Sequence, residues 1–90
     1  MEVLSSEIID AVNTQIGREL FNANQYLAIA AYFRDQALDN IAAAYQKEAE
    51  GEREHAQKFI DFLVDLRGKV NIPILDAPVN YFASAVDAAR

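Results

Sequence analysis

The feature that most constrains this fold is a seam of residues spaced three and four apart, which runs through residues 41–66. Its outer positions are apolar: Ile41, Tyr45, Phe59, Phe62 and Leu66. A helix with this spacing turns one stripe of side chains toward a neighbour and buries it. The middle of the seam instead holds Glu48, Glu52 and His55, the single histidine of the chain. Because an ionised carboxylate in a core is costly unless it is paired or binds a cation, the pattern favours a metal ion at these positions.

A second seam of the same spacing precedes the first and also contains one charged residue, Glu19. Its other positions are apolar: Ile9, Val12, Ile16, Ala23, Tyr26, Ala30 and Phe33. The spacing predicts a helix over about residues 5–36, with Ser5 or Ser6 as its N-cap.

The seam with the histidine predicts another helix over about residues 40–67, with Asp39 or Asn40 as its N-cap. Gly68 fits the C′ position after this helix. The connection between the two helices is so short that they must be antiparallel neighbours.

The remaining residues are expected to form an extended crossing over 69–77 and a short helix over about 78–89, which Pro78 begins. The prediction is an all-α fold with one domain, residues 1–90, built as a long antiparallel helical hairpin with a short C-terminal helix. Since a lone hairpin leaves wide apolar faces uncovered, we expect two copies to dimerise into a four-helix bundle.

The charged seam positions of the two helices are expected to meet. At 1.5 Å per residue, Glu19 lies roughly 26 Å from the connection, and Glu52 and His55 lie roughly 18 and 22 Å from it. Glu52 and His55 are three residues apart and therefore share a face. The chain has no cysteine, so carboxylate and imidazole groups are its strong metal ligands, which suits iron, manganese or zinc.

Here the residues resemble a known family. Glu19 and Tyr26, seven residues apart, resemble the first-helix pattern of ferritins, and the sequence EREHA at 52–56 resembles their second-helix motif. The stretch 68–78 is similar to the crossing that follows the second helix of ferritins. A full ferritin subunit is roughly twice as long, so the chain resembles the N-terminal half of a bacterial ferritin subunit. In this respect it also resembles encapsulated ferritins, in which short two-helix chains form the iron site between subunits.

The resemblance implies a ferroxidase that oxidises Fe(II) with oxygen at a di-iron carboxylate site between two chains. By resemblance, Glu19 and His55 are terminal iron ligands, Glu52 bridges the two irons of a dimer, and Tyr26 is a nearby hydrogen-bond or electron donor. Glu48, one turn before Glu52, is a weaker candidate for a secondary metal or entry site. Haem is not expected, because bacterioferritin binds it through a Met directly after the second-helix Glu, where this chain has Arg53. The only methionine here is Met1.

The charge and hydropathy of the chain argue against two classes of partner, nucleic acids and membranes. The net charge of −6 argues against nucleic acid, and no apolar run approaches the ~20 residues of a membrane span. The N-terminus lacks the basic start and apolar run of a signal peptide, so a cytoplasmic protein is expected. The expected partner is a further copy of the chain, as a dimer or a multiple of dimers, with an enclosing shell as a further possibility.

Three alternatives stay open at this stage. The first is a dimer that binds zinc or manganese structurally, or sequesters metal without catalysis. The second is a plain helical interaction module in which the seam charges pair across an interface. For Glu19 alone, a buried salt bridge is the simpler interpretation, and Arg18, Arg34 and Arg53 are available as partners. The third is a truncated cage subunit in which no intact site forms.

Overall fold

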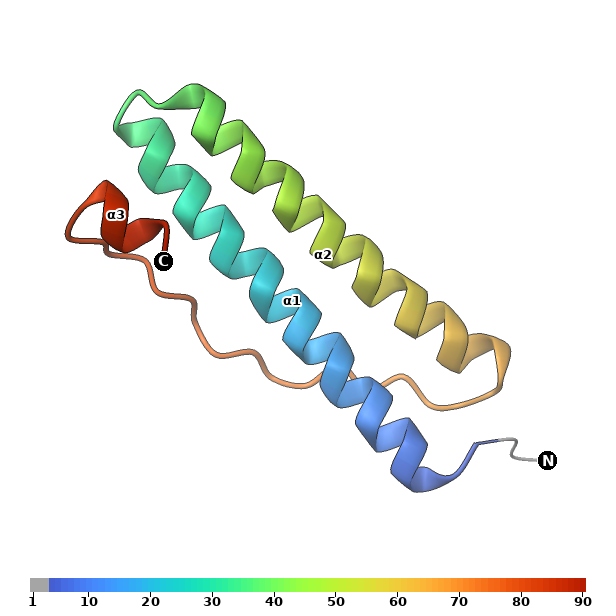
Figure 1. Ribbon diagram of the computed structural model, residues 1–90. Helices are drawn as coiled ribbons and strands as arrows, with labels where there is room; N and C mark the ends of the chain where they lie inside the picture. The colour runs from blue at the N-terminus through green and yellow to red at the C-terminus, as the bar shows by residue number, and fades with distance from the viewer. Residues whose placement is uncertain (1–3) are drawn as a thin grey trace.

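The computed structural model describes residues 4–90 and consists of two long antiparallel helices, an extended segment and a short last helix (Figure 1). Helix α1 spans Ser6–Asp35, α2 spans Asp39–Asp65 and α3 spans Ala85–Ala88. No strand occurs within this described range, which confirms the all-α hairpin. Met1 and the residues up to position 3, on which the expectations about haem and a signal peptide partly rest, lie outside it. No helix among residues 4–90 is long and apolar enough to cross a membrane.

The first helix begins where the sequence predicts. Ser5 is its N-cap, and the Ser5 hydroxyl accepts a hydrogen bond of 3.2 Å from the backbone N–H of Ile8. The expected cap of the second helix is wrong, because Asp39 is already helical and Leu38 occupies the cap position without a side-chain hydrogen bond. The Leu38 N–H instead donates to the carbonyl of Phe33, and this bond closes the end of α1.

Both long helices end in the same motif, with a residue other than glycine in the left-handed conformation. These residues are Ala37 and Arg67, each with a φ of 59°. Gly68 therefore lies one position after the left-handed residue instead of at it, and its N–H donates to the carbonyl of Leu63 at 2.7 Å. This is the arrangement of a Schellman motif, in which the second residue past the cap bonds back into the helix.

A buried stripe of three alanines and one leucine on α2 faces α1. Ala42, Ala49, Ala56 and Leu63 recur every seven residues along α2, and each is at most 3% exposed. Alanine side chains allow the helix axes to approach closely, and the larger side chains pack at the two ends of the hairpin. One buried cluster contains Ile29, Phe33, Ala42 and Ala88, and the other contains Ile16, Ala56 and Leu63. The charged seam positions lie between these clusters.

The crossing segment, residues 69–82, runs extended along the side of α1 that faces away from α2 (Figure 1). Two amide side chains of α1 hold it, each by a pair of hydrogen bonds. Asn13, which is 8% exposed, donates to the carbonyl of Lys69 and accepts from the N–H of Asn71. Gln25 donates to the carbonyl of Val79 and accepts from its N–H, both at 2.9 Å. Each amide thus bonds the segment as a neighbouring β-strand would.

The expected helix over residues 78–89 is much shorter in the structure. The backbone stays extended through residue 82, and α3 begins only after Ser84, whose hydroxyl accepts from the N–H of Asp87. The physical reason is the contact with Gln25, which occupies both backbone groups of Val79 and so removes them from helical hydrogen bonding.

Gly17 permits the crossing segment to approach α1. A Cβ atom added at Gly17 would lie 2.5 Å from Cγ of Pro73. We expect Gly17→Ala to displace the segment, at a cost of about 1–3 kcal/mol for overpacking against a gain of about 1 kcal/mol in helix propensity. Gly51→Ala is the matched control, because nothing lies within 4 Å of its added Cβ. Denaturant unfolding should show Gly51→Ala as the more stable variant; equal stability of the two would contradict the close contact.

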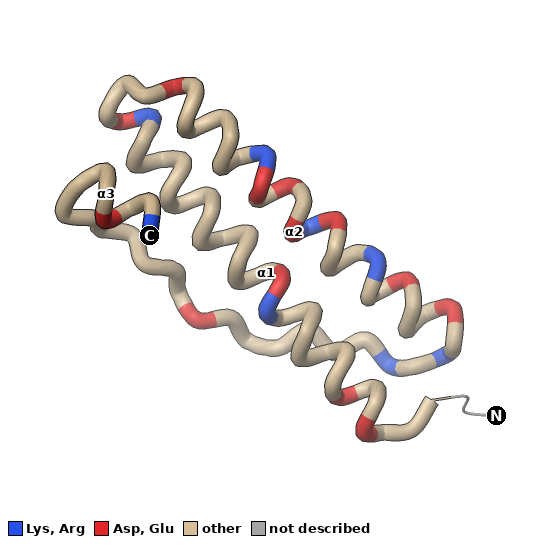
Figure 2. The backbone as a smooth tube through the Cα atoms, viewed as in Figure 1, with Lys and Arg blue, Asp and Glu red and all other residues tan. Residues whose placement is uncertain are grey.

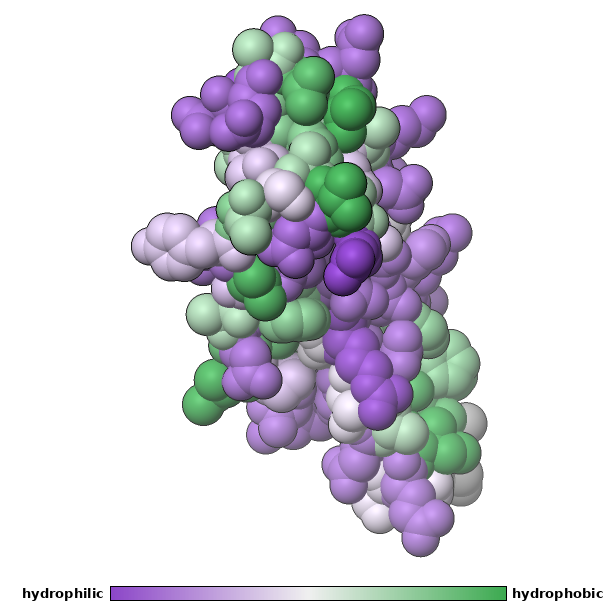
Figure 3. Space-filling model, turned by 60° about the vertical axis from the view of Figure 1, so that its left-hand side comes forward, coloured by the Kyte–Doolittle hydropathy of each residue, from purple (hydrophilic) through white to green (hydrophobic). Residues whose placement is uncertain are grey.

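Most of the large apolar side chains that remain exposed fall in two groups. Leu38, Ile41 and Phe62 lie on α2 or at its start and are 40–43% exposed. The other group lies on the crossing segment and α3 and includes Ile72, Ile74, Val79, Tyr81 and Val86. Figure 3 brings the side of α3 forward and shows hydrophobic patches there between hydrophilic residues.

Candidate metal centre

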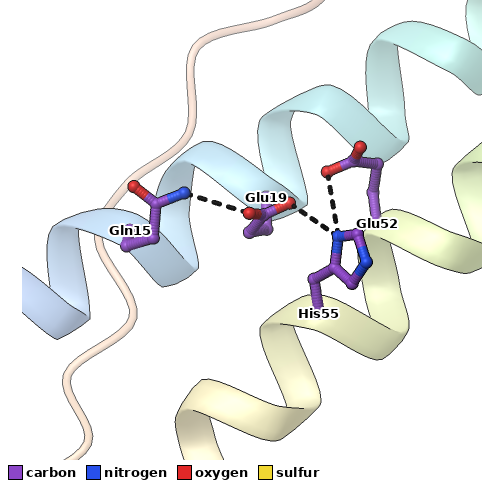
Figure 4. A network of polar contacts seen from close by, with 4 residues as sticks. All are labelled: Gln15, Glu19, Glu52 and His55. Atoms are coloured by element: carbon purple, nitrogen blue, oxygen red, sulfur yellow. Dashed lines mark hydrogen bonds and ion pairs between the residues drawn. The ribbon is translucent and has the colours of Figure 1, made fainter.

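Glu19 of α1 meets Glu52 and His55 of α2 midway along the hairpin (Figure 4). One ligand atom from each of the three residues lies within 4.8 Å of the others. His55 Nδ1 is 3.5 Å from Glu19 Oε2 and 3.9 Å from Glu52 Oε2. These separations are compatible with three groups that share one cation, since metal–ligand bonds of about 2.0–2.2 Å place ligand atoms a few Å apart.

The positions of Glu52 and His55 relative to the buried alanines of α2 explain why they meet Glu19. Ala49 and Ala56 face α1 and are almost completely buried, and Glu52 and His55 lie on the adjacent stripe of the same helix. Their spacing of three residues stacks the two side chains one turn apart. The antiparallel hairpin then brings Glu19 to the same level. Figure 2 shows acidic positions grouped midway along α2.

The three side chains differ in exposure. The side chains of Glu19 and Glu52 are 13% and 17% exposed, whereas that of His55 is 56% exposed. The group is therefore covered by the hairpin on one side and open on the other.

The two carboxyl groups shift each other's pKa in opposite directions. The hydrogen bond to Glu52 is the largest effect that lowers the pKa of Glu19, and burial opposes it. The same hydrogen bond, together with burial and the charge of Glu19, raises the pKa of Glu52. Of the two carboxyl groups in the metal-free pair, Glu52 is therefore the one that loses its proton at the higher pH.

Among residues 4–90, His55 is the only basic residue with a nitrogen within 4.0 Å of these carboxylates. Within the described range, residues 4–90, neither Glu19 nor Glu52 has a lysine or arginine nitrogen within 4.0 Å. A salt bridge from Glu19 to Arg18, Arg34 or Arg53 is thus not found among residues 4–90 of one chain. Two carboxylates and an imidazole are a donor set that iron, manganese and zinc accept, so the group fits a divalent cation.

Tyr26 and Glu48 lie outside this three-residue group. Tyr26 is half-buried and packs against the cluster around Phe33, with its ring centroid 6.0 Å from that of Tyr45. Glu48 is exposed and lines a surface hollow with Tyr26, Ala44 and Tyr45. The roles expected for Tyr26 and Glu48 stay predictions.

Gln15 is a polar neighbour that the sequence reasoning missed. Its Nε2 donates a 3.0 Å hydrogen bond to Oε1 of Glu19 (Figure 4). The signal was available, because residues four apart on a helix share a face and Gln15 precedes Glu19 by one turn.

The opposed shifts predict how stability of the metal-free protein depends on pH. Because the pKa of Glu52 is raised, its favourable contribution is complete below the ordinary glutamate pKa and is lost as the pH rises through the folded-state value. The contribution of Glu19, whose pKa is lowered, is present above the ordinary value and is lost in more acidic solution. We expect metal-free Glu52→Gln, which stays neutral, to melt at a higher temperature than the parent at pH 7 and at a similar temperature near pH 4. Calorimetric melting curves in chelator check this, and a Glu52→Gln variant that is less stable at pH 7 would contradict it.

Comparison with known proteins agrees with these features. The profile of the Ferritin family, described as a ferritin-like domain, matches residues 9–90. A bacterial non-heme ferritin from Staphylococcus haemolyticus is 32% identical over 88 residues, which cover 98% of this chain and 53% of the relative. A bacterial non-heme ferritin from Campylobacter jejuni is 31% identical over 85 residues, covering 94% of this chain and 51% of the relative.

A solved structure is similar in the same region. The open pore ferritin of the hyperthermophilic archaeon Archaeoglobus fulgidus superposes with a TM-score of 0.90 at 28% identity, over 98% of this chain and 54% of that protein. The chain thus spans about half the length of the curated relatives it matches.

Proposed function

This chain belongs to the family of ferritin-like domains, and we propose that it binds Fe(II) and oxidises it with oxygen at the group formed by Glu19, Glu52 and His55. The observation that carries the proposal is the convergence of two largely buried carboxylates and an imidazole without a lysine or arginine partner within the described chain. A cation is the natural counter-charge for such a pair. Iron is the substrate in this proposal.

A second copy of the chain completes the site in our proposal. The open side of the group, where His55 is exposed, continues into the exposed apolar residues Ile41 and Phe62 on the same stripe of α2. A partner on this face would bury both the apolar stripe and the metal group. The chain spans about half the length of these relatives, so two copies together are close in length to one relative.

A two-fold dimer would supply two Glu19, two Glu52 and two His55. Known ferritin-like di-metal bundles use one Glu from each of two helices and a Glu-x-x-His from each of the other two, a rule that we adopt rather than derive. Four carboxylates balance the four positive charges of two Fe(II) ions. In this arrangement Glu52 bridges the two metal positions, and Glu19 and His55 are terminal ligands.

Each Fe(II) gives up one electron, so a pair of irons can reduce oxygen by two electrons, with two protons, to hydrogen peroxide. The chain's residues contribute by holding the two irons close together. Tyr26 is proposed as a nearby hydrogen-bond or electron donor, and Glu48 as a secondary metal or entry ligand.

The test is an anaerobic titration of the metal-free protein with Fe(II), in which bound iron per chain and assembly mass are measured together. One iron per chain at the mass of a dimer or a multiple of dimers is the expected result. Admission of oxygen should then consume oxygen and produce Fe(III). Binding without oxygen uptake would favour the non-catalytic metal-binding dimer, and no tight binding would leave the helical interaction module.

A further inference from the structure

Three residues on one side of α1 form a short polar chain that leads to the metal group. Arg18 Nη1 donates to Gln15 Oε1 at 3.4 Å, and Gln15 Nε2 donates to Glu19 Oε1 at 3.0 Å. Gln15 is half-buried between these two charged residues. The end of the chain is a carboxylate that the proposed function assigns to iron.

The identities of the two neighbours fix which end of the Gln15 amide faces Glu19. A guanidinium group only donates hydrogen bonds, so the oxygen of the amide must face Arg18. An ionised carboxylate only accepts, so the NH₂ group must face Glu19. With Arg18 on one side and Glu19 on the other, the reversed amide would lose both contacts.

Because of the hydrogen bond from Gln15, the two carboxylate oxygens of Glu19 have different partners. Oε1 accepts from Gln15, whereas Oε2 points toward His55 Nδ1 at 3.5 Å (Figure 4). Only Oε2 therefore faces the point where Glu19, Glu52 and His55 converge.

We propose that Gln15 is a positioning residue that keeps Glu19 a one-oxygen metal ligand. The inference rests on the proposed function, because it assumes that a cation binds at this group. A carboxylate that is free of Gln15 can turn and chelate the cation through both oxygens. Chelation would use a coordination position that must stay open if a small molecule such as oxygen is to approach the metal.

The experiment uses Co(II) as a probe, because its visible absorption reports coordination number and it does not require oxygen. The test variant is Gln15→Leu, which removes the donor with little change in size. The control variant is Gln57→Leu. Gln57 Nε2 donates a hydrogen bond of 2.8 Å to the carboxylate of Asp61, which lies four residues later on the exposed side of α2. Arg18→Met keeps the Gln15 side chain but removes the hydrogen bond that fixes which end of its amide faces Glu19.

In Gln15→Leu the second oxygen of Glu19 is free to bind Co(II), so we expect the spectrum of the bound ion to change. Its visible bands should weaken as coordination increases through the second oxygen. Arg18→Met should show a smaller change of the same kind, and Gln57→Leu should match the parent protein. Gln15→Met provides the same test if the leucine variant does not reach the helical content of the parent by circular dichroism.

Two outcomes would overturn the inference, and they are distinguishable. If the parent protein binds Co(II) and both Gln15 variants keep its spectrum, the positioning role is wrong while the metal site stands. If the parent binds neither Co(II) nor Fe(II), the proposed function is wrong and the role of Gln15 falls with it.

Discussion

Replacing Glu52 with alanine is expected to reduce Fe(II) oxidation by more than 100-fold. Loss of a residue that only supports a ligand commonly costs about 10–100-fold in metal affinity or activity, and loss of a ligand should exceed that range. Glu52 is the bridging ligand in our proposal, so a dimer of the variant would lose both bridges at once. Initial rates of oxygen uptake after Fe(II) addition, compared at equal protein concentration, check this expectation.

Glu54→Ala is the matched control for this loss of negative charge. Glu54 lies on the same helix two residues later, is exposed, and is not part of the three-residue group. We expect Glu54→Ala to retain the parental rate. Equal losses in both variants would mean that overall acidity rather than ligation supports oxidation, and a Glu52→Ala variant with unchanged activity would refute the assigned site.

Leu63→Ala is expected to lower the free energy of unfolding by about 2–5 kcal/mol. Leu63 is 0% exposed and packs in the cluster with Ile16 and Ala56. Truncation would leave a cavity between the two long helices, where the surrounding backbone is already fixed by the hydrogen bond from Gly68 to the Leu63 carbonyl. Denaturant unfolding at one fixed protein concentration is the appropriate measurement, because self-association would make the midpoint depend on concentration.

The neighbouring residue offers a control that differs mainly in burial. Val64 is 59% exposed, so Val64→Ala should change the free energy of unfolding by no more than about 0.5 kcal/mol. Similar losses for both variants would indicate that Val64 is buried by another copy, whereas a loss below 1 kcal/mol for Leu63→Ala would contradict the packing described for this cluster.

Periodicity was sufficient to predict the hairpin and the meeting of its charged residues. The spacing of three and four identified the stripe that each helix turns inward, and the fixed rise per residue placed Glu19 near the level of Glu52 and His55. These predictions depend only on regular helical geometry and a short connection. Regular helical geometry therefore predicts that Glu19, Glu52 and His55 meet, but it does not predict the hydrogen bonds around them.

The errors concern contacts between segments that are far apart in the sequence. Pro78 and the apolar positions after it satisfy local rules for a helix start, yet Gln25, which lies 54 residues earlier, binds the backbone of Val79 in an extended conformation. Local rules also assigned the left-handed position to Gly68, whereas the backbone places Arg67 there. Such choices depend on packing of the whole hairpin and cannot be inferred from neighbouring residues.

The mode of attachment of the crossing segment also bears on amide exchange with solvent. In the part of the chain that the structure describes, side chains of α1 accept from the N–H groups of Asn71 and Val79. The exposed residues between them, such as Ile72 and Ile74, lack the regular ladder that slows exchange in α1 and α2. Release of the two amide side chains would free the segment while the contacts between α1 and α2 persist. We therefore expect the amides of the crossing segment to exchange with solvent faster than those of the hairpin, because the segment can open at a lower free energy.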